Sequence, residues 1–223
     1  MKTSDVLTKH LISFMERQQD FWCIADTESR FIHANKAAFI ISLLPMNLDI
    51  EGKLICECPV SWCEYGDIVH FHQQIVLKSG NTLFYVINHI TGKKRLPQPF
   101  FVKKSVYYNH SKIAGTISHG RKIPPRLLSE HFFKNPNTPY FLTNHPPNNI
   151  FTTEELNVLF FAMKLMSNQE IALRLGTYCC VVEQIIQQIY KKIDIYTRKQ
   201  LRDYGIAERF DNYFPPFLLK GLL

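Results

Sequence analysis

The sequence has little of what several classes of protein require. Its 223 residues include only nine glycines. It contains no glycine-rich phosphate loop, no nucleophile elbow and no HExxH motif, so we do not expect an enzyme. Six cysteines are too sparse for a disulfide-stapled secreted scaffold. No apolar run approaches the roughly 20 residues that span a bilayer, and the N-terminus lacks the features of a signal peptide. These absences predict a cytoplasmic protein with no membrane partner.

The net charge of +7 is unevenly distributed. Residues 1–92 hold 7 Lys and Arg against 10 Asp and Glu, a net charge of −3. Residues 93–134 hold 10 against 1, a net charge of +9, and residues 151–223 hold 9 against 8, a net charge of +1. The basic central segment indicates an anionic partner such as nucleic acid. An ordinary solvated surface is the alternative that composition leaves open.

Residues 135–150 separate two regions of different character. This stretch contains four prolines and five asparagines, which disfavour both helix and strand. We therefore predict a first domain at 1–120, a linker with one short helix at 121–150, a second domain at 151–207 and an apolar tail at 208–223. The tail is expected to pack on the first domain or across a dimer, because its side chains are too apolar for comfortable exposure.

The first domain is predicted to mix helices and strands. Its expected elements are, in order, a helix at 4–18, strands at 21–26 and 29–35, a helix at 36–44, an ambiguous segment at 62–77, and strands at 81–91, 100–108 and 112–120. This order, and the stretch FWCIADTESRFIHANKAA in particular, resembles a PAS domain. The resemblance implies an α+β domain with a five-stranded antiparallel sheet that acts as a sensor or in dimerisation.

The second domain is predicted to be all-helical. Capping boxes, in which Ser or Thr is followed three residues later by Glu or Gln, begin at Thr152, Ser167 and Thr197. Gly176 can end the second helix in a left-handed conformation. Between Gly176 and Thr197, apolar residues recur at helical spacing in CCVVEQIIQQIYKKIDI. The pattern therefore predicts four helices.

The helices predicted at 168–175 and 179–192 form a helix-turn-helix, whose second helix can enter the DNA major groove. The stretch FTTEELNVLFFAMKLMSNQEIALRLGTYCCVVEQIIQQIYKKIDIYTRKQL resembles the LuxR-type four-helix DNA-binding domain. A PAS domain ahead of it resembles PAS-LuxR bacterial regulators and, more distantly, the TraJ-like architecture. A serine usually caps the recognition helix where this chain has Tyr178, and Thr177 is the expected substitute.

The resemblance implies a homodimeric, sequence-specific DNA-binding transcription regulator with double-stranded DNA and RNA polymerase as partners. The base-reading positions correspond to Glu183, Gln184 and Gln187. The expected backbone contacts come from Thr152, Ser167, Asn168, Lys191, Lys192, Arg198 and Lys199. The alternative is a protein-binding adaptor with a degenerate helix-turn-helix, because Glu183 repels phosphates and residues 151–223 carry little net charge.

Regulation is expected through the PAS-like domain, by a small ligand or by dimerisation. The aromatic residues predicted to line a ligand pocket are Trp22, Phe31, Phe39, Phe84 and Tyr85, and ordinary core packing is the alternative. No metal site is expected, because Cys56, Cys58 and Cys63 do not have a standard ligand spacing. Haem on His70 or His72 remains an alternative to a small organic ligand or to no cofactor.

Overall fold

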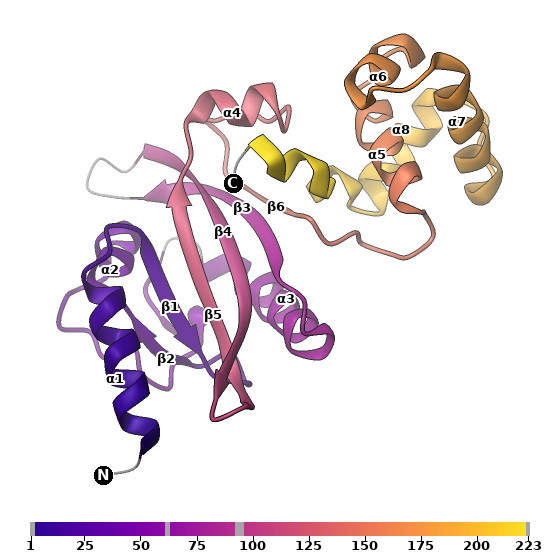
Figure 1. Cartoon of the computed structure of the whole chain (residues 1–223). Coiled ribbons are helices and arrows are strands. Elements are labelled where there is room, and N and C mark those ends of the chain that lie inside the picture. Colours follow the sequence, from indigo (N-terminus) through magenta and orange to yellow (C-terminus); the bar gives the residue numbers. More distant parts are fainter. Residues whose placement is uncertain (1–2, 61–62, 92–95, 222–223) are drawn as a thin grey trace. The chain divides into compact units, whose positions relative to one another are not determined.

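The computed structural model describes residues 3–60, 63–91 and 96–221 (Figure 1). The chain divides into two compact units. The first unit comprises residues 1–130 and 134–141, and the second comprises residues 131–133 and 142–223. The division falls within the segment predicted as a linker. No helix of the described residues is long and apolar enough to cross a membrane.

The first unit is built on a six-stranded sheet in the order β2-β1-β5-β4-β3-β6. Strand β1 is antiparallel to both β2 and β5, and β4 is antiparallel to both β3 and β5. The strands are β1 (Phe21–Ala25), β2 (Phe31–Ala34), β3 (Leu83–Thr91), β4 (Leu96–Asn109), β5 (Lys112–Lys122) and β6 (Tyr140–Thr143). The architecture is therefore PAS-like and α+β, as the sequence predicts.

The prediction of five strands is wrong, because β6 adds a sixth beside β3. Strand β6 lies within the stretch predicted as a linker. Its four residues, YFLT, favour strands, and they follow Pro139 directly. Proline is tolerated at the edge of a sheet, where its missing N–H disrupts no central ladder. The prolines therefore restrict this strand to the edge without preventing it.

Four α-helices accompany the sheet: α1 (Thr3–Glu16), α2 (Lys36–Ser42), α3 (Gly66–Ser79) and α4 (Pro125–Glu130). Short 3-10 turns occur at η1 (Ile55–Glu57) and η2 (Cys63–Tyr65). The fully buried Asn35 joins three of these elements. Its Oδ1 accepts hydrogen bonds from Trp22 N and Ala38 N, both at 3.0 Å. Its Nδ2 donates to Met15 O at 2.8 Å. One amide therefore caps α2 and holds α1 and β1 beside it.

The second unit contains the four helices α5 (Thr153–Ala162), α6 (Asn168–Leu175), α7 (Cys179–Ile193) and α8 (Arg198–Ala207). All three predicted capping boxes are present, at Thr152, Ser167 and Thr197. Gly176 adopts φ 62°, in the left-handed conformation predicted for it. The helix starts were predictable because each depends on a local side-chain to backbone bond.

The C-terminal tail contributes to the core of the second unit. It forms the 3-10 turns η3 (Phe210–Asn212) and η4 (Pro216–Gly221). Phe214 is fully buried, and its ring lies 5.1 Å from that of Phe132 in an edge-to-face contact. The sequence indicated that the tail would be covered but did not predict this position within its own unit.

Candidate nucleic-acid interface and ligand cavity

Helix α7 has one buried and one exposed face, as predicted. Val182, Ile186 and Ile189 are buried on one side. The predicted base-reading residues Glu183, Gln184 and Gln187 are all exposed on the other. The expected cap by Thr177 is wrong, because the N-cap is Tyr178, which makes no side-chain capping bond. Tyr178 has extended backbone angles at this position, so α7 begins at Cys179, two residues beyond the threonine.

Lys192 is held by an ion pair that its sequence position does not reveal. Its Nζ lies 2.7 Å from Glu155 Oε2 and 3.2 Å from Ile150 O. The Glu155 side chain is only 5% exposed, and the same oxygen accepts a hydrogen bond from Thr152 N at 2.7 Å. Thr152 and Lys192, both expected at the DNA backbone, thus serve first to start α5 and to tether α7 to it.

Arg198 and Asn168 are bonded to each other, with Arg198 Nη2 donating to Asn168 Oδ1. Burial lowers the pKa of the half-buried Arg198 guanidinium. Ser167 caps α6 and exchanges hydrogen bonds with Glu170. Of the seven side chains expected at the DNA backbone, Lys191 and Lys199 are exposed without an ion pair among the described residues. The phosphate contacts of this set stay a prediction.

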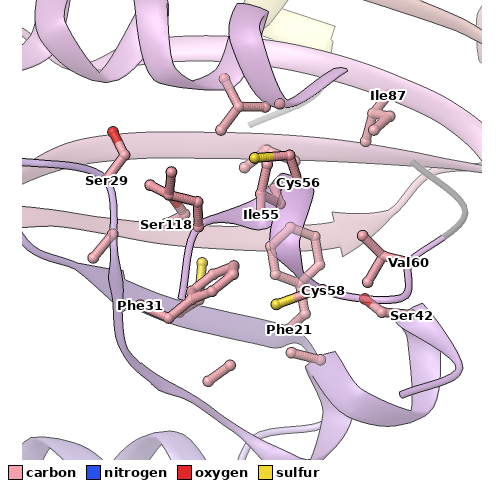
Figure 2. A pocket seen from close by; sticks show the side chains of 18 of the residues that line it. Phe21, Ser29, Phe31, Ser42, Ile55, Cys56, Cys58, Val60, Ile87 and Ser118 are labelled. Carbon is pink, nitrogen blue, oxygen red and sulfur yellow. The ribbon is translucent and has the colours of Figure 1, made fainter. Parts of the chain in front are cut away.

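The first unit encloses a cavity of about 320 Å³ (Figure 2). This volume lies near the lower end of the range for small-molecule sites, roughly 300–1,000 Å³. Figure 2 shows Phe21 of β1, Phe31 of β2 and Cys58 close to one another, with Ser29 and Ser118 at one side of the cavity. The polar and ionisable lining residues include Glu28, Ser29, Asp67, His70, Gln73, His89, Lys104 and Ser118.

Lys104 is a cation in a largely apolar lining and is only 3% exposed. Desolvation by burial lowers the pKa of its ammonium to about 8, against the opposing influence of Cys23. Among the described residues, its Nζ has one hydrogen bond, a long one of 3.5 Å to Gln73 Oε1. No carboxylate pairs with it among the described residues. The ammonium therefore retains the capacity to bind a further acceptor.

Gln73, on α3, connects this cation to the turn between β1 and β2. Its Oε1 also accepts a hydrogen bond from Thr116 Oγ1 at 3.0 Å, and its Nε2 donates to Asp26 O. The neighbouring Gln74 donates to Thr27 O at 3.2 Å. His70 Nδ1 lies 2.7 Å from Ser29 Oγ. Three residues on one side of α3 thus hold the turn that forms part of the cavity wall.

The predicted pocket aromatics are only partly in the cavity. Phe31 and Tyr85 line it, whereas Phe39 is buried in an adjoining core cluster. Trp22 and Phe84 are not among the lining residues, and they stack on His119 and Phe101. Neighbouring residues of a strand point to opposite faces, so Trp22 lies on the other side of β1 from Phe21 and Cys23.

The histidines considered for haem are engaged by the protein. His70 lines the cavity and bonds to Ser29, and the buried His72 lies 5.3 Å from the Phe141 ring in a stacked arrangement. Within residues 3–60, 63–91 and 96–221, no three His, Cys, Asp or Glu side chains gather as a metal site. The functional residues that the sequence did not reveal are Lys104 and Gln73. Lys104 lies at even spacing from Phe100 and Val102 in β4, so alternation along the strand indicated that it shares their face.

Comparisons with known proteins show which solved structures share this fold. No protein-family model and no curated protein sequence matches the chain. Among solved structures, the phage VqmA–DPO complex is 22% identical, with a TM-score of 0.50, over 98% of this chain and 96% of that one. The chain has the fold of VqmA. The Vibrio cholerae VqmA dimer, described as a LuxR-type receptor, is 21% identical, with a TM-score of 0.50, over 94% of this chain and 92% of that one. The likeness in fold thus extends over nearly the whole chain.

Proposed function

We propose that this protein is a sequence-specific DNA-binding transcription regulator, in which α7 reads bases in the major groove. The observation that carries the proposal is the exposed polar face of α7, the second helix of the helix-turn-helix. Gln184 and Gln187 can each pair with adenine N6 and N7, and Glu183 can accept from cytosine N4. The likeness to VqmA, a dimer studied for its DNA binding, supports the same reading. Dimeric action, RNA polymerase as a partner and a cytoplasmic location belong to this proposal.

The cavity supports a second part of the proposal, regulation by a small ligand. Its volume suits a small, mainly apolar molecule rather than a large prosthetic group, which disfavours the haem alternative. The Lys104 ammonium would bind a hydrogen-bond acceptor or a negative charge on that molecule. The similar phage VqmA was solved in complex with DPO, so a small-molecule site is compatible with this fold. The protein would act as a receptor and not as an enzyme.

Replacing Gln184 and Gln187 together by alanine is expected to abolish sequence preference while the protein stays folded. Each lost bidentate contact should reduce discrimination between bases by about 1–3 kcal/mol. The preferred sequence would first be selected from genomic fragments, and binding would then be measured by fluorescence anisotropy. Gln188→Ala is the matched control, because Gln188 lies on the same exposed helix without an assigned base contact. Unchanged preference in the double variant would favour the adaptor alternative.

The natively purified protein is expected to carry a small non-covalent ligand. Native mass spectrometry should show an adduct that disappears on denaturation. Lys104→Met should reduce its occupancy strongly, because the variant lacks the only lysine or arginine among the described residues that line the cavity. Lys103→Met, at the exposed neighbouring position of β4, should leave occupancy unchanged. Equal adducts in both variants would exclude Lys104 as the anchor.

A further inference from the structure

The first unit contains a long stretch of chain without any negative charge. From Leu96 to Arg126, which covers β4, β5 and the start of α4, the sequence holds six Lys and Arg residues and no Asp or Glu. Lys104 is buried in the cavity, and Lys112 lies at the opposite end of the β4–β5 hairpin from Lys122. The cations that remain near the start of β4 and the end of β5 are Lys103, Arg121, Lys122 and Arg126.

The register between β4 and β5 brings Lys103 and Arg121 together. Lys103 pairs with His119, and Phe101 pairs with Arg121. Phe101 and Lys103 are two residues apart on β4, so they share the sheet face with His119 and Arg121. Lys104 points to the opposite, cavity-lining face. Lys122 follows Arg121 at the end of β5 and is exposed. It pairs with Phe100 and therefore lies on the opposite face of the sheet from Arg121. We call Lys103 and Arg121 the basic face.

The cations of the basic face are not neutralised within the described part of the chain, where neither Lys103 nor Arg121 forms an ion pair with a carboxylate. On the same face, Asp20 is engaged by His119, whose Nε2 lies 3.0 Å from Asp20 Oδ2. The Arg121 guanidinium lies 5.9 Å from the centre of the Phe101 ring. This cation–π contact supports the guanidinium without removing its hydrogen-bond donors.

The second unit, in contrast, has few cations that are available to contact phosphate. Residues 151–223 carry a net charge of only +1. Lys192 is paired with Glu155, and Arg198 is half-buried and bonded to Asn168. Phosphate contacts supply most of the sequence-independent affinity of DNA-binding proteins. A base-reading helix with an exposed glutamate therefore requires positive charge from elsewhere in the chain or from a second copy.

We propose that the basic face of the first unit binds the phosphate backbone of double-stranded DNA. The inference rests on the proposed function, because it supplies the sequence-independent part of the affinity that α7 lacks. The same β-strands would then carry two functions on opposite faces: Lys104 toward the cavity and Lys103 toward DNA. The contact sets affinity and its salt dependence, whereas Gln184 and Gln187 set base preference.

The test compares two double variants of the full chain with equal loss of charge. The first is K103Q/R121Q, and the control K9Q/K78Q removes two exposed lysines from elsewhere in the first unit. Binding to a fluorescein-labelled mixed-sequence duplex is followed by anisotropy between about 50 and 200 mM salt. Each lost phosphate contact lowers the slope of log K against log salt by about 0.9, so the basic-face variant should lose roughly two units of slope. Its affinity at the lowest salt should fall about tenfold or more, and the control should match the wild type.

Each other outcome contradicts the proposal and shows which part of it fails. Equal slopes for the two double variants would overturn the basic face while leaving the proposed function intact, provided that wild-type base preference still depends on Gln184 and Gln187. No salt-sensitive DNA binding by the wild type would overturn both. Vesicles with anionic lipids serve as a second probe. If the basic-face variant loses vesicle binding but keeps its DNA slope, the partner is a membrane surface and the DNA proposal fails.

Discussion

Replacing Lys104 by methionine is expected to raise the free energy of unfolding of the first unit by about 3 kcal/mol at pH 7. Burial lowers the pKa of the ammonium from 10.5 to about 8, and this difference is the free energy lost by keeping the charge in the cavity. Methionine has similar length, carries no charge and leaves Gln73 Oε1 bonded to Thr116. Stability would thus increase at the expense of ligand binding, a trade-off common at functional sites.

The stabilisation should depend on pH with a definite sign. Between about pH 8 and 10.5 the unfolded chain binds more protons at Lys104 than the folded chain does, so the wild type gains stability relative to the variant as pH rises. The advantage of the variant should therefore shrink from about 3 kcal/mol toward zero across this window. Cys23 and Tyr85, whose pKa values are raised by burial, act in the opposite direction. Both are present in the two proteins, but the Lys104 charge also lowers the pKa of Cys23, so the difference between the proteins reports Lys104 together with its interaction with Cys23.

Tryptophan fluorescence during urea unfolding measures this effect in the first unit alone. Both tryptophans of the sequence, Trp22 and Trp62, belong to residues 1–130. The control is Lys103→Met, which changes an exposed neighbour on the same strand and should alter stability by less than about 0.5 kcal/mol. A destabilised Lys104→Met protein, or a difference that does not vary with pH, would mean that the ammonium already has a strong partner in the folded chain.

The sequence predicted best those features that are encoded within a few residues. The capping boxes at Thr152, Ser167 and Thr197 depend on contacts three residues apart, and the buried face of α7 follows from helical periodicity. Strand β6 could not be predicted in the same way. Its four residues become a strand only by pairing with β3, almost fifty residues earlier in the chain, and proline-rich surroundings conceal that partner.

In the candidate sites, too, the sequence does not show those side-chain contacts that depend on residues far apart in the chain. The alternation in FWCIA shows that Trp22 and Phe21 face opposite ways, but not which of them faces the cavity. The adjacent Lys103 and Lys104 must likewise point in opposite directions, and only the position of α3 and the cavity decides which one is buried. Lys192 was predicted to be free for phosphate, because its partner Glu155 lies 37 residues away along the chain.

Replacing Glu155 by alanine is expected to destabilise the second unit by about 2–3 kcal/mol. The change removes the reciprocal half of the capping box on α5, a 2.7 Å bond from Thr152 N, together with the 2.7 Å ion pair to Lys192. The expected loss of stability is smaller than for a fully buried ion pair, because the Lys192 ammonium is hydrated again once it is released. Glu154→Ala, at the exposed neighbouring position, is the control. Urea unfolding followed by far-ultraviolet circular dichroism should show the loss, with tryptophan fluorescence of the first unit unchanged.

Lys192→Gln separates the two roles of Lys192, tether and phosphate contact. As a tether, Lys192 compensates the charge of a carboxylate that is 5% exposed, so its loss should destabilise the second unit by at least 1 kcal/mol. As a phosphate contact, it should lower the salt slope of DNA binding by about 0.9 without changing stability. We expect the loss of stability, because the Lys192 ammonium is already paired with Glu155. A lowered slope with unchanged stability would instead show that DNA displaces Glu155 from Lys192. The second unit would then offer more positive charge to DNA than the ion pair suggests.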